Sequence, residues 1–298
     1  MATLRDIRRR ISSVESTIQV TRTMEMVSTA KIRKAQNRIE HARPYANALA
    51  EMLEQVATSS RKIKHPLLAV RENKKVIVAL CIASDRGLAG GFNINIIHMT
   101  ESFVREMTEQ GIEVRLITIG RKLTDYFNEI GIEPILSFVG HSGEPSYEDA
   151  REIANLVISQ YSEAEIDEVA LIYNHFINVA TQRPEVTVLL PVSAESIVGE
   201  KKDVYEDEDE SYKKWIFEPS AKSVLKTLLP KYVEVLIFQA LLESAASEHG
   251  ARRVAMKAAS DNASNMIVTL TRSYNRARQA AITTEISEIV GGAEALKG

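Results

Sequence analysis

Residues 4–56 read LRDIRRRISSVESTIQVTRTMEMVSTAKIRKAQNRIEHARPYANALAEMLEQV, and the spacing of their apolar residues decides the fold. Steps of three and four alternate through Leu4, Ile7, Ile11, Val14 and Ile18, and again through Ile32, Ala35, Ile39, Ala42, Ala46, Leu49, Leu53 and Val56. The chain has no glycine before Gly87 and no proline before Pro44. The pattern predicts one very long helix, with at most one kink, that carries a coiled-coil seam. Residues 3–57 would span roughly 80 Å as a helix.

The middle of this seam departs from the pattern. The heptad places Thr21, Glu25 and Ser28 on the seam, whereas the apolar residues Met24, Met26 and Val27 fall off it. Two interpretations stay open. One is a local stutter in the heptads or scattered exposed apolar residues. The other is an apolar surface that faces a partner around the helix, a role that suits methionine because it is flexible and polarizable.

The period of the apolar pattern changes at Lys74. Five short β-branched segments are typical of strands: KKVIVALCIA, EVRLITIG, EPILSFVG, DEVALIYNHF and PEVTVLLP. Segments with helical spacing lie between them: FNINIIHMTESFVREMTEQG, GRKLTDYFNEIG and YEDAREIANLVISQYSEA. This alternation predicts a Rossmann-like α/β domain at 74–218, with a mostly parallel sheet covered by helices. Residues 59–73 are then a linker, and the acidic stretch 203–214, DVYEDEDESYKK, is a solvated loop near the end of the domain.

Helical spacing returns from Ser220 to the C-terminus, with Pro230 as a kink or a fresh start. The seam here runs through Ala259, Ala263, Met266, Leu270, Tyr274, Ala277 and Ala281. As a helix, residues 231–289 would extend roughly 88 Å. Two long helices at opposite ends of one chain can bury their apolar stripes on each other. We therefore predict an antiparallel coiled coil of residues 1–58 and 219–298, next to the α/β domain.

Composition and charge exclude several classes of protein. A hydrophobic fraction of 45% is enough for a packed core. The formal charge is only -3, but both ends of the chain are basic and its middle is acidic. Cys81 is the single cysteine, which excludes an internal disulfide and a cysteine-based zinc site. No apolar run reaches about 18 residues and the start lacks the apolar core of a secretory signal, so we expect a soluble chain that can sit on a membrane complex.

The stretch most similar to a ligand site is SDRGLAGGFN, residues 84–93, because a glycine-rich loop between a strand and a helix can cradle a phosphate. It matches neither G-x-G-x-x-G nor G-x-x-x-x-G-K-[ST], which favours a structural turn. The six histidines include no helical ligand pair, and the sequence has no G-x-S-x-G. No aromatic residues interleave the N-terminal basic residues, which argues against nucleic acid. We expect no catalytic, cofactor or metal site.

Four segments of the chain resemble blocks of the F-type ATP synthase γ subunit family. They are ATLRDIRRRISSVESTIQVTRTMEMVSTAKIRKAQ, SDRGLAGGFN, ASEHGARRVAMKAASDNASNMI and ITTEISEIVGGAEA. The last is similar to the family signature, with Ile282, Thr283, Glu285, Glu288, Gly292 and Ala293 at the expected places. The resemblance covers essentially the whole chain, in the right order.

This resemblance implies a non-catalytic rotor subunit of a central stalk, which couples proton or sodium flow through a ring of c subunits to ATP synthesis or hydrolysis. The coiled coil would sit inside a 3:3 hexamer of α and β subunits. The α/β domain, here called the foot, would meet the ε subunit and the c-ring. The hexamer contacts expected are Arg8, Arg9, Met24, Glu25, Met26, Val27, Arg278, Gln279, Thr283 and Glu285. The foot would include Gly87, Gly90 and Gly91.

Some features depart from the family pattern or leave alternatives. Arg22 and Thr23 stand where some relatives have Lys and Ala, and Cys81 alone does not permit the thiol regulation of the chloroplast form. The start at Met1, with no transit-like leader, favours the cytoplasmic face of a bacterial cell membrane; a mature organellar chain is the alternative. Two other functions stay open: an α/β enzyme with coiled-coil arms and a nucleotide site on the GLAGG loop, and a purely structural tether.

Overall fold

Two very long helices dominate the computed structural model, which describes residues 3–59, 65–192 and 217–295. Helix α1 covers Leu4–Ser59 and helix α6 covers Ala221–Ala295, with 56 and 75 residues. Both helices continue through a proline, Pro44 in α1 and Pro230 in α6. Pro230 is therefore no fresh start. Its neighbours Leu229 and Tyr232 are buried, and this packing offsets the hydrogen bond that a proline removes.

A five-stranded sheet in the order β3-β2-β1-β4-β5 lies between these helices in the sequence. The strands are β1 (Val76–Ile82), β2 (Glu113–Ile119), β3 (Leu136–Phe138), β4 (Glu168–Phe176) and β5 (Gln182–Leu190). The helices are η1 (Pro66–Leu68, a 3-10 turn), α2 (Phe92–Glu109), α3 (Arg121–Glu129) and α4 (Tyr147–Ser162). Strands β1 to β4 pair in parallel, and β5 is antiparallel to β4. The predicted mostly parallel sheet with interleaved helices is confirmed.

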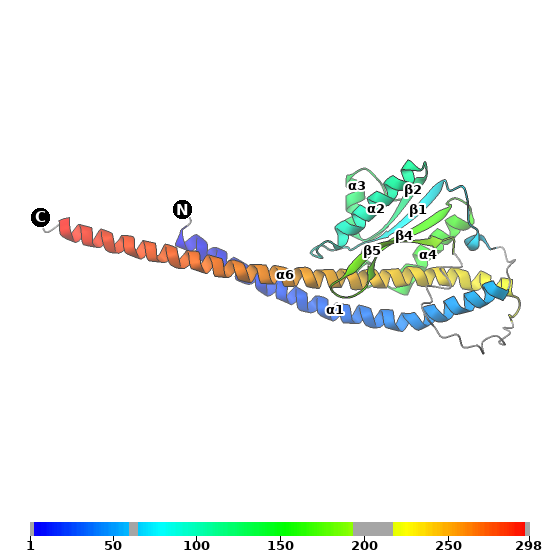
Figure 1. The fold of residues 1–298 in the computed structure, drawn as a ribbon, viewed down its shortest axis with the longest axis horizontal. Coiled ribbons are helices and arrows are strands. Elements are labelled where there is room, and N and C mark those ends of the chain that lie inside the picture. Colours follow the sequence, from blue (N-terminus) through cyan, green and yellow to red (C-terminus); the bar gives the residue numbers. More distant parts are fainter. Residues whose placement is uncertain (1–2, 60–64, 193–216, 296–298) are drawn as a thin grey trace. The chain divides into compact units, whose positions relative to one another are not determined.

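The central strand β1 is buried on both faces of the sheet. Ala79 and Cys81 pack in one apolar cluster with residues of α2 and α3. Leu80 belongs to a second cluster on the other face, with residues of α1, α4 and α6 that include Leu53 and Leu229. Figure 1 shows α2 and α3 on one side of the sheet and α6 on the other. The second face of the sheet is thus covered by parts of both long helices as well as by α4.

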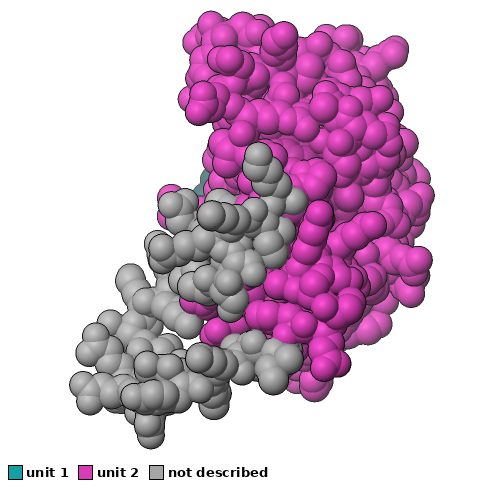
Figure 2. All heavy atoms as spheres, turned by 90° about the vertical axis from the view of Figure 1, so that its right-hand side faces the viewer, with its two compact units in different colours: residues 1–29, 252–298 teal, residues 30–251 magenta. Residues whose placement is uncertain are grey.

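The chain forms two compact units, coloured separately in Figure 2. One consists of residues 1–29 and 252–298, and the other of residues 30–251. The second unit contains the sheet and the parts of α1 and α6 that cover it. The four domains predicted from the sequence are continuous segments of the chain, whereas each compact unit includes parts of both long helices. The predicted domain boundaries stay a prediction. The acidic stretch 203–214 lies outside the described residues.

Within residues 30–251, α1 and α6 run antiparallel. Ala35 lines a pocket with Ala245, whereas Ala46 lines another with Val235, so residue numbers fall along α6 as they rise along α1. An antiparallel pair of long helices was predicted, and this part of it is confirmed.

The predicted seam of α6 is wrong at one position. Met266 is 54% exposed, and the adjacent Ile267 is the half-buried residue between Ala263 and Leu270. Both residues are apolar. The heptad accepts steps of four and three through Ile267 as well as steps of three and four through Met266. The pattern of apolar residues alone therefore could not decide between the two neighbours.

Substitution of Gly120 tests the junction between β2 and α3. This residue has a φ of +103°, and a Cβ there would clash with the main-chain carbonyl of Ala83. We expect Gly120→Ala to lower the free energy of unfolding by about 3–5 kcal/mol, because backbone strain adds to a clash with main-chain atoms. Gly131→Ala is the matched control: its φ is +81°, but a Cβ would meet nothing within 4 Å. The control should lose only about 1–2 kcal/mol in denaturant unfolding; equal losses would show that the clash is not real.

Candidate functional site

The stretch around Met26 exposes apolar side chains in the unit formed by residues 1–29 and 252–298. Thr21 and Ser28, which occupy the seam, are only 7% and 2% exposed, whereas Met26 is 66% and Val27 52% exposed. The hydroxyl of Thr21 donates to the main-chain carbonyl of Thr17 at 3.0 Å, so its burial leaves no donor without a partner. Because Thr21 and Ser28 keep their heptad positions, the seam has no stutter here. Met26 and Val27 lie on the outward face as predicted, whereas Met24 is half-buried; that a partner covers this face stays a prediction.

All ten predicted contact residues belong to this same unit. Met24 and Glu25 are half-buried, and the other eight are exposed. The hydroxyl of Thr283 donates to the main-chain carbonyl of Gln279 at 3.0 Å and is therefore used within the helix. The remaining polar side chains offer guanidinium, amide and carboxylate groups to a partner.

A second apolar surface lies on the C-terminal part of α6, and the sequence reasoning did not identify it as a contact surface. Ile282, Ile286 and Ile289 are 47%, 55% and 71% exposed, and their spacing of four and three puts them on one face of the helix. Val290 beside them is also exposed. The available signal was a new alternation of four and three that begins at Ile282, one residue after the predicted seam ends at Ala281. A stripe of large apolar side chains in water is typical of a surface that another protein covers.

The glycine-rich loop at the carboxyl end of β1 is closed by its own polar residues. The N–H of Ser84 donates to Oδ1 of Asn93 at 3.0 Å, which joins the two ends of the loop. Gly90 has a φ of +56°, a conformation that favours glycine, and Gly91 is the N-cap of α2. A Cβ at Gly87 would meet nothing within 4 Å, so nothing around this residue requires glycine on steric grounds. These contacts fit the structural turn that we predicted.

The carboxylate of Asp85 joins this loop to the loops that follow β2 and β3. It accepts hydrogen bonds from the N–H groups of Arg121 (3.0 Å) and Gly140 (2.9 Å), and from the N–H and hydroxyl of Ser142 (3.2 and 2.9 Å). Partial burial raises the pKa of Asp85, but the hydrogen bonds outweigh it and the pKa lies below its usual value. Arg121 is the first residue of α3, so this charge lies at the N-terminus of α3, whereas the glycine-rich loop leads into α2.

In the described part of the chain, neither the single cysteine nor a cluster of metal ligands supplies a reactive site. Burial raises the pKa of the Cys81 thiol to about 12, so the thiol is protonated and unreactive at neutral pH. Across residues 3–59, 65–192 and 217–295, no group of three or more His, Cys, Asp or Glu side chains is placed to hold a metal ion. Over the same ranges, no helix has a stretch that is long and apolar enough to cross a membrane.

Comparisons with known proteins agree on one family. The family model described as ATP synthase matches residues 3–296. The ATP synthase gamma chain of Pelotomaculum thermopropionicum is 50% identical over 297 residues, and that of Desulfitobacterium hafniense is 49% identical; both alignments cover 100% of each chain. Among solved structures, a chain of the central stalk and c-ring of the Tetrahymena thermophila mitochondrial ATP synthase is 25% identical, with a TM-score of 0.61 over 81% of this chain and 99% of that one. A chain of the Euglena gracilis mitochondrial ATP synthase, 18% identical, has the same fold, with a TM-score of 0.64 over 98% of this chain and 94% of that one.

Substitution of Asp85 tests the loop junction and its charge. Asp85→Asn replaces one acceptor oxygen by an amide donor, so we expect the free energy of unfolding at pH 7 to fall by about 1–3 kcal/mol. The lowered pKa means that the carboxylate stabilises the fold above its unfolded pKa of about 3.9, and that this stabilisation is lost as the pH falls through the lower folded value. The difference between the two proteins should therefore shrink below about pH 4.

Urea unfolding at a series of pH values measures this difference. Asp125→Asn, an exposed site on α3, is the control and should unfold like the unchanged protein at pH 7. A difference for Asp85→Asn that stays constant down to about pH 2 would contradict the role of the charge.

Proposed function

Because this chain belongs to the family of ATP synthase gamma chains, we propose that it is the rotor subunit of the central stalk of an F1Fo ATP synthase. It couples proton or sodium flow through a c-ring to ATP synthesis or hydrolysis in a hexamer of α and β subunits. The subunit is non-catalytic, and the chemistry of ATP takes place in the hexamer. By turning, it changes the relative free energies of the three β subunits, which is a coupling between distant sites.

The exposed apolar face of Ile282, Ile286 and Ile289 is the observation that best supports this function. Full burial of one such side chain is worth about 1.5–3 kcal/mol, so a partner that encloses this part of α6 gains substantially. Apolar contacts are non-directional and do not fix one rotational orientation, unlike a set of hydrogen bonds. A shaft that turns inside its partner needs such a surface. We infer that this part of α6 lies inside the hexamer.

The predicted polar contacts are proposed to hold the shaft on its axis. Exposed ion pairs of Arg8, Arg9 and Arg278 with acidic partner residues would each contribute no more than about 1 kcal/mol, so they can break and re-form at every step. Met26 and Val27 offer an adaptable apolar surface beside them. Eight of the ten hexamer contacts proposed from the sequence have exposed side chains, which supports this proposal, whereas Met24 and Glu25 are half-buried.

The foot, residues 74–218 with Gly87, Gly90 and Gly91, is proposed to meet the ε subunit and the c-ring. Its link to the helices is firm within residues 30–251, because α1, α6 and the sheet share one apolar core. The chain is a peripheral F1 subunit. The cytoplasmic face of a bacterial cell membrane is a finer proposal, supported by the bacterial relatives that match at half of all positions.

Charged substitutions on the apolar face of α6 test the rotor function directly. Ile286→Asp combined with Ile289→Asp places two carboxylates on the surface that we expect the hexamer to cover, and coupled ATP synthesis should fall by roughly tenfold or more. Synthesis is measured in vesicles that contain the complete complex. Ser287→Asp, exposed on the same helix, is the control and should retain most of the activity. Full activity of the double variant in an assembled complex would sink the proposed function.

Charge reversal tests the polar contacts. Arg8→Glu, Arg9→Glu and Arg278→Glu together should lower coupled ATP synthesis by roughly two- to tenfold, with a larger effect at low salt, because each exposed pair is weak and screened. Native mass spectrometry should still find one copy of the chain with three α and three β subunits. Arg105→Glu, exposed on α2, is the control for a charge reversal elsewhere. Unchanged coupling at low salt would rule out the proposed polar contacts.

A further inference from the structure

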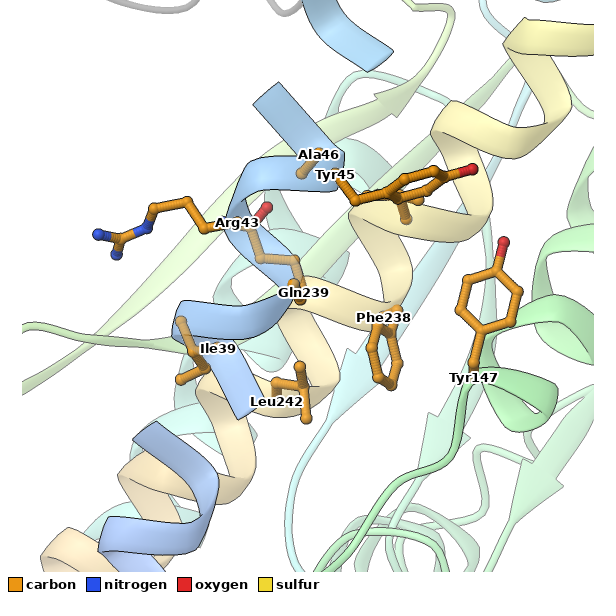
Figure 3. A pocket seen from close by; sticks show the side chains of 10 residues that line it. Ile39, Arg43, Tyr45, Ala46, Tyr147, Phe238, Gln239 and Leu242 are labelled. Atoms are coloured by element: carbon orange, nitrogen blue, oxygen red, sulfur yellow. The ribbon is translucent and has the colours of Figure 1, made fainter. Parts of the chain in front are cut away.

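A small apolar cavity lies within residues 30–251, where α1, α4 and α6 meet (Figure 3). Its volume is about 130 Å³. The side chains around it come from all three helices: Ile39, Ala42, Arg43, Tyr45 and Ala46 from α1, Tyr147 from α4, and Val235, Phe238, Gln239 and Leu242 from α6. Most of these are hydrocarbon or aromatic groups, which offer water few hydrogen-bond partners.

The aromatic wall of this cavity is held in place by neighbouring polar groups. The rings of Tyr147 and Phe238 meet edge to face with 5.6 Å between their centres. The hydroxyl of Tyr147 donates to Oε2 of Glu234 at 2.6 Å, and Nζ of Lys231 lies 2.7 Å from the same oxygen. Glu234 is only 3% exposed, so this network is itself fixed by packing. The guanidinium of Arg38 lies 5.9 Å from the centre of the Phe238 ring.

On the α1 side, two of the five lining residues are small alanines, which leaves space in the cavity. Ala42 and Ala46 of α1 line the cavity where a larger side chain would fill it. Since Tyr147 and Phe238 are held by their own contacts, they cannot collapse into the space without losing them. The cavity is therefore largely preformed, which lowers the cost of binding a ligand.

The size and the walls of the cavity define the ligand. The volume of about 130 Å³ is slightly below the about 150 Å³ of an apolar cavity that holds one benzene molecule, so a single six-membered ring is the largest group expected to fit. Two aromatic rings on one wall favour an aromatic guest, because edge-to-face and offset contacts add to the gain from burial. Access is available near Tyr45, which is 55% exposed, and Arg43 projects away from the other labelled side chains in Figure 3.

We propose that this cavity is a binding site for one small monocyclic aromatic molecule, of the size of phenol. A bound ring touches α1, α4 and α6 together and therefore stabilises the joint between the long helices and the layer that covers the sheet. The rotor function does not require such a ligand, so the site is a separate property of the chain.

Phenol is the probe for this site. In a calorimetric titration of the full chain, phenol should bind at one saturable site and raise the midpoint of thermal unfolding by about 2–4 °C at saturation. Cyclohexanol, which has nearly the same size but no aromatic ring, should bind about two- to tenfold more weakly. Equal binding of the two would overturn the assignment to aromatic ligands, and no saturable binding of either would overturn the site.

Substitutions on α1 locate the binding. Ala46→Leu fills the cavity and should abolish phenol binding without lowering the thermal midpoint of the unliganded chain, and Ala42→Leu is a second filling variant should the first fail to fold. Ala48→Leu, exposed on the same helix and outside the cavity lining, should bind phenol like the unchanged chain. Undiminished phenol binding by a folded filling variant would show that phenol binds elsewhere and would overturn the proposal.

Discussion

Burial of one apolar stripe on each long helix is the constraint on which the rest of the structure depends. Within residues 30–251, Leu53 of α1, Leu229 of α6 and Leu80 of β1 belong to one cluster and are fully buried. The same side chains therefore close the helix pair and cover the sheet. Each contributes about 1.5–3 kcal/mol by burial, and loss of any of them weakens both contacts together. A common core of this kind is what lets sheet and helices in this unit respond to a load as one body.

The periodicity of the sequence predicted the long helices and their inner faces, but not what covers those faces. Leu49, Leu53 and Val56 were placed on the seam and are buried. The pattern records only that a face avoids water, so it could not reveal that these residues also contact the sheet. The choice between Met266 and Ile267 failed for a related reason, because two adjacent apolar residues fit the heptad almost equally well. The continuity of α6 through Pro230 depends on tertiary packing, which a local rule for proline does not include.

Some features of the candidate site could also be predicted from the local sequence pattern, and others could not. Exposure of Met26 and Val27 followed from their positions off the seam. Ile286 was missed as a contact because the apolar pattern alone does not show whether such a residue is buried against another helix or exposed. The role of Asp85 was also out of reach of the sequence, since its partners come from two other loops, more than thirty positions away.

The stretch of α1 around Met26 buries polar side chains and exposes apolar ones. Where the seam carries Thr21 and Ser28, burial between helices gains little hydrophobic free energy, although the Thr21 hydroxyl is satisfied within its own helix. Next to these residues, Met26 and Val27 leave their apolar area in water. The chain by itself is thus less stable at this point than a regular heptad would make it, and the proposed contact with the hexamer would restore the loss. If the hexamer covers this surface as proposed, the free energy that holds this stretch in place comes from non-directional contacts, which can be exchanged for equivalent ones as the shaft turns.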